Sequence, residues 1–177
     1  MPFTGPLLSL TTFGSGIPAM WPALQPSKKI AAMGAINPQS ATTVQTTGWV
    51  DASTFENFLA LIEVGVISSG GTVNATVQQA SSATGTGAKQ VYSGNNTSGT
   101  ALSITALTQA GGSGNQQVLI NIKNDDLDAS NGFRWLQLSI TPSGAAALIA
   151  GQLLGVDARY GPADTLAPAA QVQIVGP

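Results

Sequence analysis

From Thr43 onward, short runs of the sequence alternate apolar with polar residues. The clearest run places Val118, Ile120 and Ile122 at every second position. A period of two with β-branched residues predicts a strand with one buried face. The same alternation recurs at 73–77, 102–106 and 136–140. Turn-forming residues separate these runs, in clusters at 68–71, 85–87, 94–99, 111–115 and 129–132. We therefore predict an all-β protein, an antiparallel β-sandwich of the jelly-roll kind.

Two further segments fit a strand or a helix. Phe55, Phe58, Leu59, Ile62 and Val66 would also line one face of a helix, and the apolar run 145–154 has the length of a short helix. The glycine, valine and isoleucine within and beside them favour strands. The stretch 81–100, which is rich in Ser, Thr, Gly and Asn, is interpreted as a long hairpin or a mobile loop.

The first 42 residues differ from the rest of the chain. They hold six of its ten prolines, and Lys28 and Lys29 are their only charged residues. Proline disfavours both a long helix and a central strand. The segment is nevertheless too apolar for a free disordered tail. We predict an extended arm over 1–42 and a β-sandwich domain over 43–177. Whether the arm packs on its own domain or on a neighbouring molecule stays open. Its apolar residues include Phe3, Leu7, Leu8, Leu10, Phe13, Ile17, Met20, Trp21 and Leu24.

Ionisable residues are scarce: only 8% of the chain is charged, and the formal net charge is -2. Ordinary soluble domains carry about 25% charged residues. Such a surface is either covered by other subunits, because charges are depleted at interface cores, or is neutral and polar. Nucleic-acid binding needs many Lys and Arg contacts to phosphate. Six scattered basic residues do not supply them, so no nucleic-acid partner is expected.

The absence of histidine and cysteine excludes several kinds of chemistry. Ser-His-Asp triads, Cys-His pairs, His-ligated or thiolate-ligated zinc and disulfides all need these residues. We expect no catalytic residue, no cofactor and no metal, and therefore not an enzyme. No run of eighteen apolar residues predicts a membrane span. The N-terminal sequence lacks the pattern of a signal peptide, so we expect synthesis in the cytoplasm.

One acidic residue and one acidic segment are candidate sites. Glu63 lies in an apolar run, where a buried carboxyl would have a raised pKa. The alternative is that it faces solvent on an edge strand or pairs with Arg134 or Arg159. Structural ion pairs also perturb pKa values, so we favour the alternative.

Asp126, Asp128 and Ser130 have the alternate spacing of a calcium loop. An EF-hand would need Gly one residue earlier and Glu at the twelfth position, where Gln137 stands. We interpret the segment as an Asx-type turn.

The aromatic residues Trp49, Phe133, Trp135 and Tyr160 are candidates for a sugar-binding platform. Aromatic side chains more commonly fill a core or an interface, because they dominate the energetics of both. We therefore rank a carbohydrate-binding or carbohydrate-hydrolysing β-sandwich as a distant hypothesis.

Part of the chain, from Trp49 to Pro162, resembles small virion structural proteins encoded among the head genes of tailed phages and prophages. The arm lies outside the resemblance. What the resemblance implies is a capsid decoration or cement protein on the capsid surface of the virion, with the major capsid protein and copies of itself as partners, forming a homo-oligomer on the particle. A tail-tube, adaptor or spike subunit is the alternative. The matching segments are FENFLALIEVG (55–65), TVNATVQQASSATGTGA (72–88), ITALT (104–108), QVLIN (117–121), DLD (126–128) and, as the most specific, LGVDARYGP (154–162).

Seven residues are the candidates for interface contacts. Arg159 and Tyr160 belong to the most specific matching segment, and Arg159 is expected to pair with a carboxylate and fix its loop. The other five stand in the arm: Phe3, Leu7, Leu8, Phe13 and Trp21.

Overall fold

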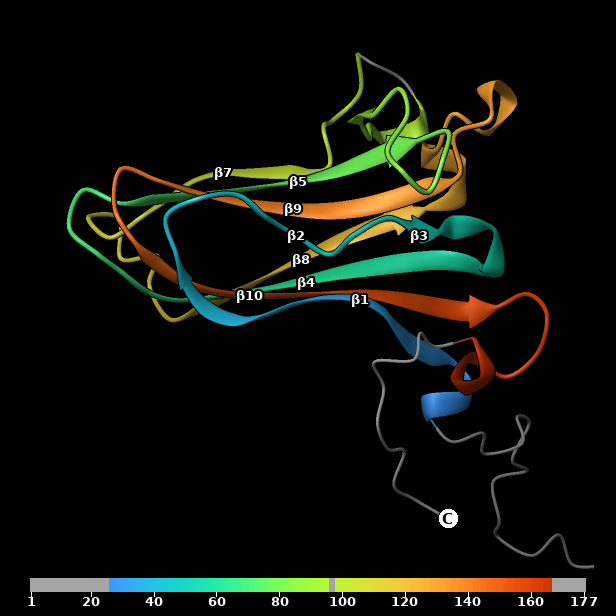
Figure 1. The fold of residues 1–177 in the computed structure, drawn as a ribbon, viewed down its shortest axis with the longest axis horizontal. Helices are drawn as coiled ribbons and strands as arrows, with labels where there is room; N and C mark the ends of the chain where they lie inside the picture. Colours follow the sequence, from blue (N-terminus) through green and yellow to red (C-terminus); the bar gives the residue numbers. More distant parts are fainter. Residues whose placement is uncertain (1–25, 96–97, 167–177) are drawn as a thin grey trace, which may run out of the picture.

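The computed structural model describes residues 26–95 and 98–166, and shows two antiparallel β-sheets packed face to face (Figure 1). Sheet A has the strand order β1-β10-β4-β8, and sheet B has β2-β9-β5-β6, with β3 beside β9 and β7 beside β5. The predicted all-β sandwich is confirmed. If β2 and β3 count as one strand position and β6 and β7 as another, the eight positions follow the order 1-8-3-6 and 2-7-4-5, which is a jelly roll.

The two ambiguous segments are both strands of sheet A. That sheet consists of β1 (Ile30–Ala41), β4 (Phe55–Ile67), β8 (Gln116–Lys123) and β10 (Ala147–Ala158). Sheet B consists of β2 (Gln45–Thr46), β3 (Val50–Asp51), β5 (Thr72–Ala80), β6 (Lys89–Gln90), β7 (Ser103–Thr108) and β9 (Trp135–Ser143).

Short 3-10 turns supply the helical structure of the described ranges. They are η1 (Pro26–Lys28), η2 (Ala52–Thr54), η3 (Ser93–Asn95), η4 (Asn124–Asp126), η5 (Ala129–Asn131) and η6 (Ala163–Thr165). No helix among the residues described is long and apolar enough to span a bilayer. The stretch 81–100, which is interpreted from the sequence as a long hairpin or a mobile loop, contains β6 and η3.

The predicted boundary of the arm at residue 42 is wrong, because Ile30–Ala41 is strand β1 of the sandwich and pairs with β10. Pro38 misled the prediction. It lies where the register of β1 against β10 shifts, between Ile36 and Gln39, and β1 is an edge strand of sheet A. A proline is tolerated at a bulge on an edge strand, since the ladder does not need its missing N–H there.

The hydrophobic core lies between the sheets. It is built from the apolar side chains that point inward at every second position of the strands. Ile62 of β4, Ile122 of β8 and Leu138 of β9 are fully or almost fully buried. Phe55 and Phe58 pack edge to face, with ring centroids 5.8 Å apart. Gly155 on β10 makes room for this pair, because a Cβ there would lie 2.5 Å from Cδ2 of Phe55. The tight packing makes the sandwich a rigid support for its two outer faces.

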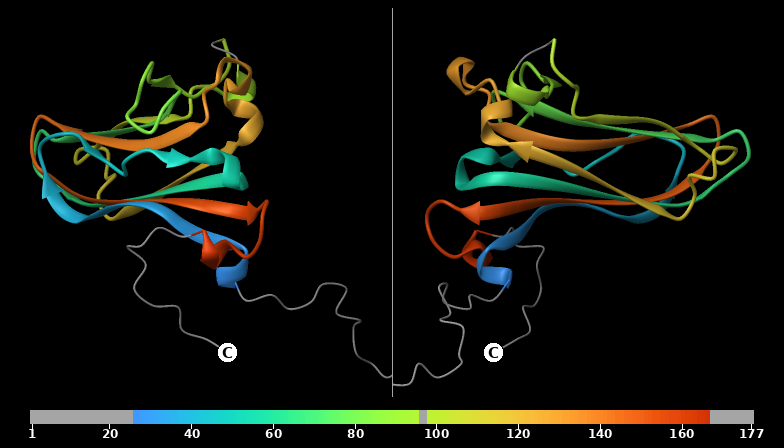
Figure 2. Two further views of the ribbon diagram at one scale, coloured as in Figure 1. Left: turned by 45° about the vertical axis from the view of Figure 1, so that its right-hand side comes forward. Right: turned by 180° about the vertical axis from the view of Figure 1, so that it is seen from behind.

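The chain enters and leaves the sandwich at one corner. η1 precedes β1 and η6 follows β10, and an ion pair between Lys28 and Asp164 joins them. In all the views, both turns lie beside β1 on the side of sheet A that faces away from sheet B (Figures 1 and 2). The chain on either side of the described body is therefore attached next to the outer face of sheet A.

Candidate interaction surface

Arg159 and Tyr160 follow directly after β10, which ends at Ala158. The Nη2 group of Arg159 donates to Oε2 of Glu56 at 3.1 Å, and its backbone N–H donates to the carbonyl of Thr54 at 3.0 Å. The prediction that Arg159 pairs with a carboxylate is confirmed, and the pair fixes the residues after β10 against the start of β4. Tyr160 is 76% exposed. Five candidates lie outside the described residues: Phe3, Leu7, Leu8, Phe13 and Trp21.

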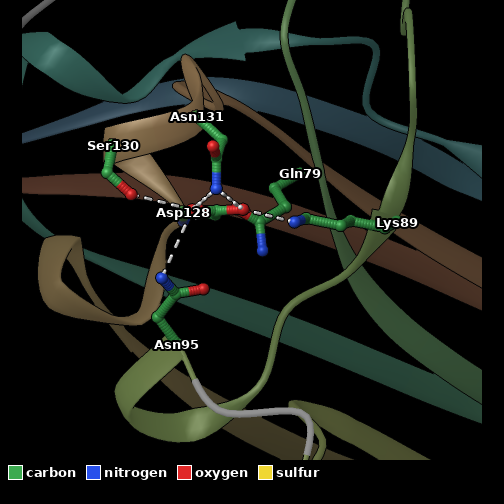
Figure 3. A network of polar contacts seen from close by, with 6 residues as sticks. All are labelled: Gln79, Lys89, Asn95, Asp128, Ser130 and Asn131. Carbon is green, nitrogen blue, oxygen red and sulfur yellow. Dashed lines mark hydrogen bonds and ion pairs between the residues drawn. The ribbon is translucent and has the colours of Figure 1, made fainter.

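The acidic segment after β8 forms a dense polar network at one end of the sandwich (Figure 3). Nζ of Lys89 donates to Oδ2 of Asp128 at 2.6 Å, and Nδ2 of Asn131 donates to both carboxylate oxygens, at 2.8 and 3.0 Å. Oγ of Ser130 and Nδ2 of Asn95 add longer bonds of 3.2 and 3.5 Å. Led by the bond from Lys89, and against partial desolvation, these donors lower the pKa of Asp128 to about 2.

The network joins segments that are distant in sequence. The N–H of Asp128 donates to Oε1 of Gln79 on β5 at 2.8 Å. Asp126 accepts from the N–H of Gly94 at 2.7 Å and from the N–H of Lys123 at 2.8 Å. Its carboxylate thus ties η3 to the end of β8. Because both carboxylates are occupied by donors of the protein itself, we interpret the cluster as a structural lock.

The turn predicted at this segment is present as η5, but it is not an Asx turn. Asp128 accepts from the side chains of Ser130 and Asn131 and makes no side-chain bond to the backbone of η5. Over 26–95 and 98–166, no three His, Cys, Asp or Glu side chains lie close enough together to hold a metal ion.

Glu63 lies on the outer face of β4 and is exposed, as the favoured interpretation predicts. It accepts a 3.0 Å hydrogen bond from Nε2 of Gln117 on β8. Two details of the interpretation are wrong: β4 is a central strand of sheet A, and the partner is neither Arg134 nor Arg159. The alternation of β4 sends Ile62 and Val64 inward and leaves Glu63 outward.

Three of the four aromatic candidates are partly buried against the protein itself. Nζ of Lys89 lies 4.0 Å from the centroid of the Phe133 ring, and the guanidinium of Arg134 lies 5.7 Å from that of Trp135. Trp49 packs on the loop at Gly85, where a Cβ would lie 2.7 Å from its indole nitrogen. These contacts favour a structural role over an open sugar platform.

The outer face of sheet A is the candidate site that the structure adds. Leucine, isoleucine, valine and alanine occupy most of its outward positions, and the side chains of Leu119, Leu148 and Ile30 are 59%, 46% and 43% exposed. Its other outward positions on β4, β8 and β10 carry four amides and the charged residues Glu63 and Lys123, and on β1 the exposed Ser40 stands opposite Leu148. The apolar members are Ile30, Ala32, Leu59, Leu61, Leu119, Leu148, Ala150, Leu154 and Val156.

This face is hollowed where β1 bulges. A shallow depression of about 320 Å³ is lined by Pro38, Glu63, Leu148 and Ala150, among others. A second hollow shares Pro38, Glu63 and Ala150 with the first and adds Leu61. The small residues Ala150 and Gly151 of β10 leave this space beside the displaced edge strand. The face therefore offers both a flat apolar area and a depression for larger side chains.

Sequence reasoning did not single out this face, although a signal for it is present. In β4, both halves of the alternation contain large apolar residues: Phe58 and Ile62 on one side, Leu59 and Leu61 on the other. Strands that are apolar on both sides are typical of sheets covered on both faces. No described segment other than η1 and η6 lies over this face (Figures 1 and 2).

Comparisons of the chain with protein-family models, with curated proteins and with solved structures gave no match.

Proposed function

We propose that this chain is a virion structural protein of a tailed phage, a decoration or cement protein that contacts the major capsid protein and copies of itself. The observation that carries the proposal is the exposed apolar outer face of sheet A. Monomeric proteins rarely expose a large contiguous apolar surface, and such surfaces mark sites of protein contact. A role in contact is also consistent with the scarcity of charged residues in the whole sequence.

The placement of the face supports adsorption to a lattice. The outer face of sheet A and both exits of the described chain lie on one side of the molecule (Figure 1). On the opposite sheet, four outward cross-strand pairs of β5 and β9 consist of uncharged polar residues. In such a protein, the apolar outer face of sheet A favours a contact with another surface, and the polar outer face of sheet B does not need one. Weak contacts suffice for this task, because many copies on one lattice add their contacts. Jelly rolls recur in viral capsid proteins, which agrees with the proposal only at the level of fold analogy.

The test is reconstitution on phage particles made without this gene. Purified protein is added, heads and tails are separated, and mass spectrometry measures the copies per particle. We expect the protein on heads, at a copy number comparable to that of the major capsid protein. A few copies per particle, or recovery with tails alone, contradicts a decoration role and favours an adaptor, spike or tail-tube subunit.

A pair of matched variants assigns the binding to the proposed face. Leu119→Glu places a carboxylate at a 59% exposed position of the outer face of sheet A, and Val44→Glu does so at a 53% exposed position between β1 and β2. We expect L119E to weaken binding to particles by about tenfold or more, because its charge would be desolvated in the contact. V44E should bind like the unmodified protein. Equal binding by both variants would place the contact elsewhere.

A further inference from the structure

The outer face of sheet A needs a cover in the free protein, before any particle is present. Water contact with the apolar side chains of Leu119, Leu148 and Ile30 is unfavourable, because apolar surface gains free energy when it is removed from water. Such a surface promotes non-specific association unless something lies on it. The described residues provide only η1 and η6, at one end of the sheet.

The segment 1–25 is attached at the edge of this face. Pro26 begins η1, and the ion pair between Lys28 and Asp164 holds η1 beside β1 on the outer side of sheet A. The N–H of Asp157 also donates to the carbonyl of Lys29 at 3.0 Å, which fixes the junction against the end of β10. The preceding residues therefore start from a defined position next to Ile30 and Val156 of the face.

The composition of segment 1–25 matches that of the face. The segment carries no Asp, Glu, Lys or Arg, and has ten large apolar residues that include Phe13, Ile17 and Trp21. It therefore brings no ionised side chain that would lose its hydration on an apolar surface. Its prolines disfavour a helix, and an extended chain lies flat on a sheet more readily.

The length of the segment is sufficient to reach the hollow at Pro38. The hollow lies eight residues along β1 from Ile30, which is about 26 Å at the rise of a strand. Ile17 stands nine residues and Phe13 thirteen residues before Pro26. An extended chain spans up to about 3.3 Å per residue, so the side chains of both residues reach this depression.

We propose that residues 1–25 cover the outer face of sheet A of the same molecule, with Phe13 or Ile17 seated in the hollow beside Pro38. A tethered segment has an effective concentration in the millimolar range, which exceeds that of a second copy in dilute solution. This intramolecular contact does not depend on the proposed function. If that function holds, docking on a particle begins with displacement of the segment.

The chain has no native cysteine, so an introduced pair reports the contact in the full-length protein. The test pair is Phe13→Cys with Leu148→Cys, at the hollow. The control pair is Phe13→Cys with Val44→Cys, which is similarly exposed but lies outside sheet A. Both introduced sites on the body are exposed, so the fold should be retained, and circular dichroism checks this. Oxidation in dilute solution is followed by mass spectrometry and non-reducing gels.

We expect the test pair to form an intramolecular disulfide about tenfold or more faster than the control pair. Cross-linked dimers as the main product would overturn the proposal, since the occupant would then be a second copy. Equal rates for the two pairs would overturn it as well. A second full-length variant, Phe13→Glu with Ile17→Glu, should increase the binding of an apolar dye relative to the unmodified protein, and unchanged dye binding counts against the proposal. None of these measurements involves particles, so they fail or succeed separately from the decoration role.

Discussion

The two sheets have similar inner faces and opposite outer faces. Inside, both contribute Ile, Leu, Val and Ala to one core. Outside, sheet A presents an apolar surface, as described above. Sheet B presents uncharged polar pairs across β5 and β9: Thr72 with Ser143, Asn74 with Thr141, Thr76 with Ser139 and Gln78 with Gln137.

The difference separates what specifies the fold from what specifies a contact. Either outer face is compatible with the jelly roll, because only the inward residues must match across the core. The hydroxyl and amide groups of sheet B can hydrogen-bond with solvent where they are exposed or with neighbouring segments, as Oδ1 of Asn74 does by accepting from the N–H of Ala106. The leucines of sheet A gain nothing from solvent and gain free energy from any apolar cover. The asymmetry is therefore the main indication of function in this molecule.

The largest expected effect on stability is the difference between substitutions on the inner and the outer face of β4. Ile62→Asp would bury an unpaired carboxylate in the core, and we expect a loss of more than about 4 kcal/mol in the free energy of unfolding. Leu61→Asp, at the next position on the outer face, should keep the fold. Urea denaturation measures both variants. Similar losses for the two would contradict the assignment of inner and outer faces on β4.

A smaller effect is expected at the glycines of β10 that face inward. Gly155→Ala would bring a methyl group within 2.5 Å of the ring of Phe55, and we expect a loss of about 1–3 kcal/mol from overpacking. Gly151→Ala is the matched control. Its Cβ would lie 3.0 Å from the end of Ile140, a side chain that can shift. Thermal unfolding should therefore rank G155A below G151A, and the opposite order would show that the Phe55 ring moves freely.

The carboxylates of Asp128 and Glu63 should contribute differently to stability as the pH falls. The pKa of Asp128 is lowered from 3.8 to about 2 in the folded protein, so its contribution to stability is present above about pH 4 and is lost as the pH falls towards 2. Asp128→Asn should lower the melting temperature at pH 7, and its difference from the unmodified protein should shrink over that window. Glu63→Gln on sheet A, with an exposed side chain and one hydrogen bond, should change the melting temperature at pH 7 little. A difference for D128N that persists unchanged at pH 2 would contradict the structural lock.

The smallest effect is expected on the outer face of sheet B. Thr72→Val with Ser143→Val replaces one cross-strand pair, of which Ser143 is exposed, by an apolar pair, and we expect a change in stability within about 0.5 kcal/mol. Binding to particles should not change. Tighter binding by this double variant would show that any apolar patch suffices, and would remove the distinction between the two faces.

The strands with one apolar side and one polar side were predicted well from the sequence. The runs around Val118, Leu136 and Val73 became β8, β9 and β5, because strict alternation with one polar side has one stable solution. β1 was missed because a single proline suggests an interruption, and only the paired strand shows that Pro38 stands at an edge bulge.

The apolar outer face of sheet A was harder to predict. A period of two divides a strand into two sets of residues, but it does not say which set faces the core when both are apolar, as in β4. Long-range partners are also beyond local patterns. Arg159 was expected to find a carboxylate, yet Glu56 lies 103 residues away in sequence, and Lys89 meets Asp128 across 39 residues. These pairs depend on the sheet topology, which becomes known only with the fold.

The ion pair between Lys28 and Asp164 makes one corner both the entrance and the exit of the sandwich. A short linker between these positions would therefore close the chain into a ring, and the ring could be reopened at an exposed loop such as 81–88 to give a circular permutant. A passenger domain fused directly before Pro26 or directly after Leu166 would project from that same corner, leaving the hydroxyl-rich back of the molecule unobstructed.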